Sequence, residues 1–131
     1  MNEIKILKEN CKYSYSPYSE FKVSAVLVTK SGKIYTGVNI ENASYGGTVC
    51  AERVAIFKAV SEGEKEFEKI YLYVEDKNGK HPITPPCGIC RQVMSEFSMD
   101  MDVIMIGDDD KKLISKVRDL LPHSFDNEYL D

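Results

Sequence analysis

The sequence predicts an α/β fold: a single three-layer domain in which a mixed β-sheet of about five strands lies between flanking helices. Three observations support this prediction. Segments rich in β-forming residues alternate with amphipathic helical segments, and the first two β-rich segments are close enough in sequence to form a hairpin. The chain of 131 residues has room for one hydrophobic core of ordinary size, so residues 1–131 are expected to form one domain.

In the first half of the chain, a helical pattern is followed by two strands and a polar loop. Ile4, Leu7 and Cys11 recur at helical spacing, and a Ser-Pro dipeptide after them stops the helix. A Ser-Gly turn separates the two β-rich segments. The predicted elements are a helix over 2–13, strands over 22–29 and 33–38, and a loop over 39–49.

In the second half, helices and strands alternate. The predicted elements are a helix over 50–61, a strand over 69–74, a proline-containing loop over 75–86, a helix over 87–97, a strand over 102–106 and a short helix over 112–121. Gly63 and Pro122 are expected to follow the ends of the first and last of these helices. The apolar stripes are expected to run through Val54, Phe57 and Ala51 in one helix and through Ile89, Val93 and Phe97 in the other.

The net charge and the absence of signal-peptide and membrane-spanning patterns in the sequence limit the partners and the location that we expect for the protein. The formal net charge is −4 and no run of Lys or Arg forms a basic stripe, which argues against a polynucleotide partner. The first ten residues mix charged and apolar groups, so no signal peptide is expected, and no apolar stretch is long enough to cross a membrane. We therefore expect a cytoplasmic protein, in which four cysteines indicate metal binding or catalysis rather than disulfides.

Two cysteine motifs lie at the starts of predicted helices. They are Cys50-Ala51-Glu52 and Pro86-Cys87-Gly88-Ile89-Cys90. Helix N-termini stabilise thiolates, so two such ends facing each other would present three thiolates to one cation. Three protein ligands and an open fourth position are typical of a catalytic zinc site, where zinc lowers the pKa of a water molecule. Glu52 is close enough in sequence to take a proton from that water and pass it to a substrate.

Two arginines directly follow motif positions. Three thiolates leave the zinc site with a net charge of −1, which a nearby cation would offset. Arg53 and Arg91 are expected to donate hydrogen bonds to the thiolates and so support the metal. Both would otherwise be surface ion-pair partners.

Other interpretations of the same residues remain open. Cys87 and Cys90 alone would suit a redox pair, but that interpretation leaves Cys50-Ala51-Glu52 unexplained. A structural zinc site would need Cys11 as its fourth ligand, although Cys11 continues the apolar stripe of the first helix. Glu52 would also be favourable simply as an acidic residue in the first turn of a helix.

These motifs resemble those of the cytidine deaminases. Cys-Ala-Glu followed by Pro-Cys-x-x-Cys resembles the signature of the zinc deaminases. In these enzymes the first metal-ligand position is occupied by a His or a Cys. With Cys50 in that position, the sequence resembles the compact homotetrameric cytidine deaminases. The resemblance extends to 15–21, to Asn39-Ile40-Glu41-Asn42-Ala43 and to 120–125, and so covers nearly the whole chain. It implies a cytidine deaminase-like fold with one zinc ion per subunit.

The resemblance also implies the reaction and further site residues. The expected reaction is hydrolytic deamination of cytidine and 2′-deoxycytidine to uridine and 2′-deoxyuridine with release of ammonia, in pyrimidine salvage. The expected nucleoside contacts come from Phe21, Asn39, Glu41 and the backbone N–H of Ala51 in one subunit, and from Ala43, Tyr45 and Phe125 of a neighbour in a homotetramer with shared active sites.

Three alternative functions stay open. Gly46-Gly47 before the first motif is similar to the blasticidin S deaminases, which would act on a cytosine-containing antibiotic. The chain would instead be a catalytically silent zinc-binding oligomer if no cytosine nucleoside were deaminated. A polynucleotide editor is disfavoured by the acidic net charge and by Cys at position 50.

Overall fold

A five-stranded mixed sheet forms the middle layer of the computed structural model, which describes residues 2–130. The strand order is β2-β1-β3-β4-β5. The β3–β4 pair is parallel and the other three neighbouring pairs are antiparallel. The strands are β1 (Lys22–Thr29), β2 (Ile34–Val38), β3 (Phe67–Glu75), β4 (Asp102–Ile106) and β5 (Lys112–Lys116). The predicted mixed sheet of about five strands with an initial hairpin is confirmed.

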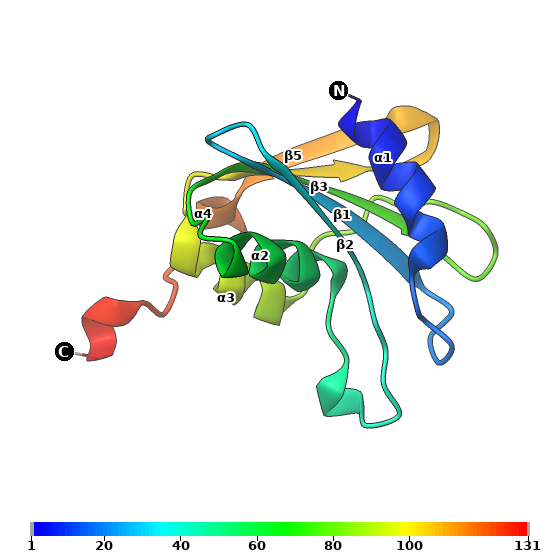
Figure 1. Cartoon of the computed structure of the whole chain (residues 1–131), viewed down its shortest axis with the longest axis horizontal. Coiled ribbons are helices and arrows are strands. Elements are labelled where there is room, and N and C mark those ends of the chain that lie inside the picture. Colours follow the sequence, from blue (N-terminus) through cyan, green and yellow to red (C-terminus); the bar gives the residue numbers. More distant parts are fainter. Residues whose placement is uncertain (1, 131) are drawn as a thin grey trace.

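Helices cover both faces of this sheet, giving the predicted three layers (Figure 1). One helix packs on one face and three on the other, with α4 beside α3. They are α1 (Glu3–Asn10), α2 (Ala51–Ser61), α3 (Gly88–Phe97) and α4 (Val117–Leu120). Residues 2–130 also contain four short 3₁₀ helices: η1 (Cys11–Tyr13), η2 (Tyr45–Gly47), η3 (Asp108–Asp110) and η4 (Asn127–Leu130).

The sheet separates two hydrophobic clusters because side chains alternate along each strand. In β1, Ala25 and Leu27 belong to the cluster on the α2–α3 face, whereas Val26 and Val28 belong to the cluster beneath α1. Leu7 of α1 is fully buried in the second cluster. The predicted apolar stripe of the first helix is therefore confirmed.

The predicted helix over 112–121 is wrong in its first half. Residues 112–116 form β5, which pairs with β4 along its full length, and only 117–120 are helical. Pairing with β4 overrides the helical pattern of this segment, because β4 is an apolar strand whose open edge needs a partner. Leu113 and Ile114 of β5 remain about half exposed, so the strand lacks the burial that would have marked it in the sequence.

The predicted apolar stripes of two helices are correct only in part, since Ala51 is fully buried and Val93 and Phe97 pack partly buried against the core. In α2 the buried residues include Ala55, Ile56 and Ala59, while Phe57 is about half exposed. In α3 the buried residues are Cys90 and Met94, while Ile89 is exposed. Small residues face the sheet in α2, and so the larger Phe57 does not mark the core.

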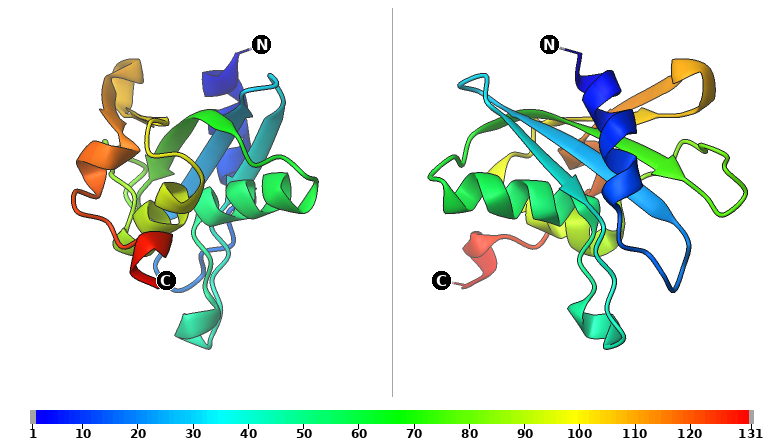
Figure 2. Two further views of the ribbon diagram at one scale, coloured as in Figure 1. Left: turned by 90° about the vertical axis from the view of Figure 1, so that its left-hand side faces the viewer. Right: turned by 45° about the vertical axis from the view of Figure 1, so that its right-hand side comes forward.

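Two segments project from this body (Figure 2). Residues 39–49 form the predicted loop, and an isolated bridge between Ile40 and Val49 closes its base. The C-terminal arm follows α4 and ends in η4. Within residues 2–130, no helix combines the length and the apolar character that a membrane crossing requires.

Candidate functional site

Three cysteine sulfurs converge where the N-terminal ends of α2 and α3 meet. The Sγ atoms of Cys50, Cys87 and Cys90 all lie within 4.8 Å of one another, and those of Cys50 and Cys87 are 3.8 Å apart. Cys50 is the N-cap of α2 and Cys87 is the N-cap of α3, so both residues lie at helix ends that have free N–H groups. The predicted convergence of two helix starts on one set of thiols is present.

The sulfur cluster fits a zinc ion. Two sulfurs bonded at about 2.3 Å to one tetrahedral zinc would be about 3.8 Å apart, which is the distance between the Cys50 and Cys87 sulfurs. Thiolates are soft ligands that zinc accepts, and three of them leave one coordination position for a non-protein ligand. A redox pair of Cys87 and Cys90 does not account for the third sulfur at this distance.

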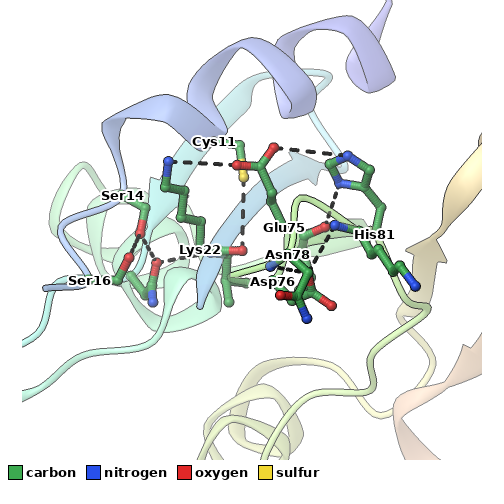
Figure 3. A network of polar contacts seen from close by, with 12 residues as sticks. Cys11, Ser14, Ser16, Lys22, Glu75, Asp76, Asn78 and His81 are labelled. Carbon is green, nitrogen blue, oxygen red and sulfur yellow. Dashed lines mark hydrogen bonds and ion pairs between the residues drawn. The ribbon is translucent and has the colours of Figure 1, made fainter. Parts of the chain in front are cut away.

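Cys11 cannot complete the cluster as a fourth ligand. It lies on the opposite face of the sheet, buried in the cluster beneath α1, and its Sγ is 3.9 Å from the carbonyl oxygen of Lys22 (Figure 3). Burial raises the pKa of its thiol to about 11, as expected for a structural cysteine. The alternative of a four-cysteine structural site is therefore contradicted.

The thiols of Cys50 and Cys90 do not ionise equally. The hydrogen bond from the Cys90 thiol is the largest of the effects that lower the pKa of Cys50 to about 5, against the opposing effect of burial. Hydrogen bonds from Arg53 and Cys87 act in the same direction. The same pairing raises the pKa of Cys90. Of these two thiols, Cys50 is therefore the one that ionises more readily.

Arg53 and Arg91 take different positions around the cluster. Arg53 donates from Nη2 to the Cys50 sulfur at 3.3 Å, as the sequence predicted. Arg91 donates instead from Nε to the carbonyl oxygen of Pro86 and from Nη1 to that of Leu120, both at 2.8 Å. The expectation that Arg91 hydrogen bonds to a thiolate is corrected, because two backbone carbonyls occupy these donors. Arg91 ties the Pro86 loop to the end of α4.

Glu52 is the buried acid of the site. Its side chain is in the first turn of α2 and only 5% of the residue is exposed. Burial raises the pKa of the Glu52 carboxyl to about 7, and the negative charge of Cys50 also raises it. A carboxyl group in this range both accepts and releases protons near neutral pH.

A cavity of about 490 Å³ opens over the sulfurs and Glu52. Its wall includes three of the residues expected to contact a nucleoside, which are Phe21, Asn39 and Glu41. The complete lining is Ser19, Phe21, Val23, Asn39, Glu41, Thr48, Cys50, Glu52, Leu72, Val74, Thr84, Pro85 and Cys87. Reactive groups therefore share the wall of a largely apolar space with a few polar side chains, which is the common form of a small-molecule site.

Asn39 is buried and almost fully hydrogen bonded. Its Oδ1 accepts from the backbone N–H of Val23 at 3.0 Å and from the Ser14 hydroxyl, and its Nδ2 donates to the carbonyl oxygen of Phe21 at 2.8 Å. An amide has two N–H donors, so one remains for a ligand in the cavity.

Glu41 is held by the turn before β1. Its Oε1 accepts from the N–H groups of Tyr18 at 2.9 Å and Ser19 at 3.1 Å, and its Oε2 accepts from the Ser19 hydroxyl. Desolvation opposes ionisation here, but these hydrogen bonds outweigh it and keep the pKa of Glu41 below its usual value. The residue therefore offers an ionised acceptor to the cavity.

The remaining predicted contact residues do not line this cavity. Ala51 is fully buried at the first position of α2, where its N–H precedes the hydrogen-bonded part of the helix. Ala43 and Tyr45 are exposed on the projecting loop. Phe125 is exposed on the C-terminal arm, stacks on Tyr129 at 5.6 Å and has its carbonyl held by Gln92.

Sequence reasoning missed several lining residues. Val23, Leu72 and Val74 line the cavity from neighbouring strands, where they are indistinguishable in sequence from ordinary core residues. Sequence patterns assign no separate role to Ser19, which lies within the 15–21 segment. The signal available in the sequence was its place two residues before Phe21 in a polar turn.

Two other features proved unrelated to the cavity. The ring of His81 stacks on Tyr73, and its Nδ1 pairs with the Val74 carbonyl while Glu75 lies beside its Nε2 (Figure 3). Asp108, Asp109 and Asp110 form the exposed turn η3.

Comparison with known proteins identifies the family. Residues 2–106 match the model described as "Cytidine and deoxycytidylate deaminase zinc-binding region". A probable cytidine deaminase of Dictyostelium discoideum is 46% identical over 119 residues, which cover 91% of this chain and 78% of the relative. A cytidine deaminase of Halalkalibacterium halodurans is 45% identical over 117 residues, covering 88% and 85%.

A solved structure shows the same architecture. The crystal structure of a cytidine deaminase from Burkholderia pseudomallei aligns with a TM-score of 0.85 at 39% identity, covering 95% of this chain and 100% of that one. The residues that this family model spans include all three cysteines whose sulfurs fit one zinc ion. The chain belongs to the family of zinc-binding cytidine and deoxycytidylate deaminases.

Proposed function

We propose that this protein hydrolyses the exocyclic amine of cytidine and 2′-deoxycytidine, forming uridine or 2′-deoxyuridine and ammonia for pyrimidine salvage. The observation that carries the proposal is the cavity that joins Cys50, Cys87 and Glu52 to Asn39 and Glu41. It combines a proton carrier, a thiol cluster and a hydroxyl-binding pair in one space of nucleoside size.

The polar pair on the wall suits a sugar hydroxyl. Asn39 has one N–H donor left and Glu41 has one acceptor position left. A hydroxyl both donates and accepts, so one hydroxyl satisfies both groups. Ribose and 2′-deoxyribose both carry a 3′-hydroxyl, which supports a proposal that includes both nucleosides.

The chemistry requires a proton to move between water, the ring and the leaving amine. Cys50, Cys87 and Cys90 would hold the zinc ion, which would supply a Lewis acid able to make a water molecule nucleophilic near neutral pH. Glu52 accepts a proton from that water and delivers one to ring atom N3 as C4 is attacked. Glu52 then takes a second proton from the hydroxyl now on C4 and gives it to the amine, so that the C4–N bond breaks, ammonia leaves and the C4 oxygen becomes the carbonyl of the product.

Other residues hold the base in place. Phe21, Val23 and Leu72 provide apolar walls that exclude water from a flat ring. The N–H of Ala51 at the start of α2 is proposed to bind the 2-oxygen of the pyrimidine. Binding the two ends of the nucleoside orients C4 toward the reactive groups of the cavity.

We also propose a homotetramer in which neighbours complete each active site. Ala43, Tyr45 and Phe125 lie outside the cavity of their own subunit, and the two aromatic rings are 78% and 56% exposed. Exposed aromatic rings on projecting segments are typical of subunit contacts. A cytoplasmic location is proposed because the thiol ligands must remain reduced, and the net charge of −4 supports a nucleoside rather than a polynucleotide substrate.

The test is a spectrophotometric assay on cytidine, 2′-deoxycytidine and blasticidin S, before and after treatment with a zinc chelator. We expect both nucleosides to be converted with one ammonia per turnover, the activity to be lost with the metal, and the activity to return when zinc is added. Conversion of blasticidin S alone would replace the substrate assignment. Bound zinc with no ammonia from any of the three would contradict the proposed function and favour a silent zinc-binding oligomer.

A further inference from the structure

The turn before β1 is built around the carboxylate of Glu41. Two backbone N–H groups, from Tyr18 and Ser19, donate to Oε1, and the Ser19 hydroxyl donates to Oε2. A carboxylate has about four acceptor positions, so this turn fills three of them. The remaining position is on Oε2, the oxygen that Ser19 orients.

The hydroxyl of Ser19 also holds the neighbouring backbone. It accepts a hydrogen bond from the N–H of Phe21 at 3.1 Å, while the carbonyl of Phe21 accepts from Asn39. Glu20 between them has a φ of 56°, in the left-handed region that non-glycine residues rarely adopt. The turn keeps this conformation because hydrogen bonds fix it on both sides.

One hydroxyl therefore links two parts of the cavity wall. Ser19, Phe21 and Glu41 all line the cavity, and the Ser19 hydroxyl bonds to both of the others. Without it, Glu41 would keep the two N–H bonds to Oε1, but nothing in this turn would fix Oε2. The carboxylate would then present its free acceptor in more than one direction.

We infer that Ser19 is a positioning residue for sugar recognition, whose hydroxyl aims the free acceptor of Glu41 at the 3′-hydroxyl of the bound nucleoside. This inference rests on the proposed function. Ser19 acts through Glu41 and takes no part in the proton transfers at Glu52. Its contribution is made in substrate binding and depends on a hydroxyl at the 3′ position.

The experiment compares variants that differ only at the hydroxyl. Thr and Val have nearly the same shape, so Ser19→Thr and Ser19→Val separate hydrogen bonding from any strain of a branched side chain. We expect Ser19→Val to raise the KM for cytidine about tenfold, the cost of one hydrogen bond to a charged group, with kcat changed by less than about twofold. Ser19→Thr should behave as the unmodified protein. Ser19→Ala should repeat the valine result without a branched side chain.

A second substrate tests whether the effect of Ser19 on KM depends on the 3′-hydroxyl of the nucleoside. With 3′-deoxycytidine, which lacks the hydroxyl, the unmodified protein and Ser19→Val should have kcat/KM values within about twofold of each other. Ser31→Val is the matched control, because the Ser31 hydroxyl also donates to a carboxylate, that of Glu64 at 3.1 Å, in the hairpin turn away from the cavity. This control should leave KM unchanged on both substrates.

Any one of three results would overturn the inference. They are an unchanged KM for Ser19→Val and Ser19→Ala, an equal loss on cytidine and 3′-deoxycytidine, and a loss confined to kcat. Zinc content and thermal melting of each variant show whether the fold is kept, and a loss shared by Ser19→Thr and Ser19→Val would assign Ser19 a structural role only. Failure of the unmodified protein to deaminate cytidine would instead overturn the proposed function, and this inference with it.

Discussion

At the scale of single residues, the site depends on a carboxyl group that is buried beside three sulfurs. Glu52 is 5% exposed, and burial raises its pKa to about 7. Such a group would be costly to bury without a function or a partner. Its position beside Cys50, predicted from a spacing of two residues, makes proton transfer its best-supported role.

Replacing Glu52 with Gln keeps the size of the side chain and removes its ability to carry a proton. We expect Glu52→Gln to lower kcat by about 10²- to 10⁴-fold, the usual contribution of a general acid–base group, with zinc content unchanged. Steady-state kinetics and metal analysis measure both quantities. Glu62→Gln, just beyond α2, is the control and should keep full activity. Near-normal turnover by Glu52→Gln would remove Glu52 from the mechanism.

Arg53 offers a second test at this scale. Its guanidinium donates to the Cys50 sulfur at 3.3 Å and would partly offset the charge of three thiolates bound to zinc. We expect Arg53→Ala to weaken zinc binding about 10- to 100-fold, as measured by competition with a chromogenic chelator. Arg118→Ala removes an exposed arginine that pairs with Asp100 at 2.7 Å and should leave zinc binding unchanged. Equal zinc affinity in both variants would contradict the role of Arg53.

At the scale of elements, the position of α2 against the sheet sets the site. Gly37 of β2 lies directly under the helix, and a Cβ there would be 2.3 Å from the carbonyl oxygen of Ala51 and 2.7 Å from the N of Ala55. Only a glycine allows this approach, which brings the N-terminal end of α2 down onto the sheet.

We therefore expect Gly37→Ala to destabilise the fold by about 1–3 kcal/mol, the usual cost of overpacking. Urea unfolding measures this loss. Gly46→Ala in the projecting loop adds a methyl group to open space, with nothing within 4 Å, and should change stability by less than about 0.5 kcal/mol. Equal stability of the two variants would show that α2 does not depend on this contact.

The positions of helices and strands could be predicted from the sequence more accurately than the faces they bury and the elements or residues they contact. The helices at 50–61 and 87–97 and four of the five strands follow from periodicity and turn residues, because these signals are local. β5 was missed because its apolar side chains are exposed and its strand form comes from pairing with β4. The site shows the same limit, because contacts between residues far apart in the sequence depend on the fold. Motif spacing predicted the three cysteines, but only the fold shows that Arg91 donates to the carbonyl oxygens of Pro86 and Leu120.

At the scale of the whole molecule, the projecting loop and the C-terminal arm are the parts not explained by the core of one subunit. Tyr45 and Tyr129 are 78% and 68% exposed, and the arm extends away from the sheet and helices (Figure 1). Their proposed role is to complete a neighbour's active site, which makes activity a property of the assembly.

Mixing two inactive variants tests this role. Glu52→Gln lacks the proton carrier, and Phe125→Ala lacks the ring proposed to reach a neighbour's base. Each homo-oligomer should have low activity. Subunit exchange should restore activity well above either parent, because a hybrid contains sites with both Glu52 and a neighbour's Phe125. Activity equal to the average of the parents, with exchange shown by native mass spectrometry, would contradict shared sites.

Zinc K-edge X-ray absorption of the purified protein, together with its metal content, tests the central claim most directly. The account predicts one zinc per subunit with three sulfur neighbours at about 2.3 Å and one lighter neighbour, because Cys50, Cys87 and Cys90 converge while Cys11 lies across the sheet. Four sulfur neighbours, or a protein that binds no zinc, would contradict it.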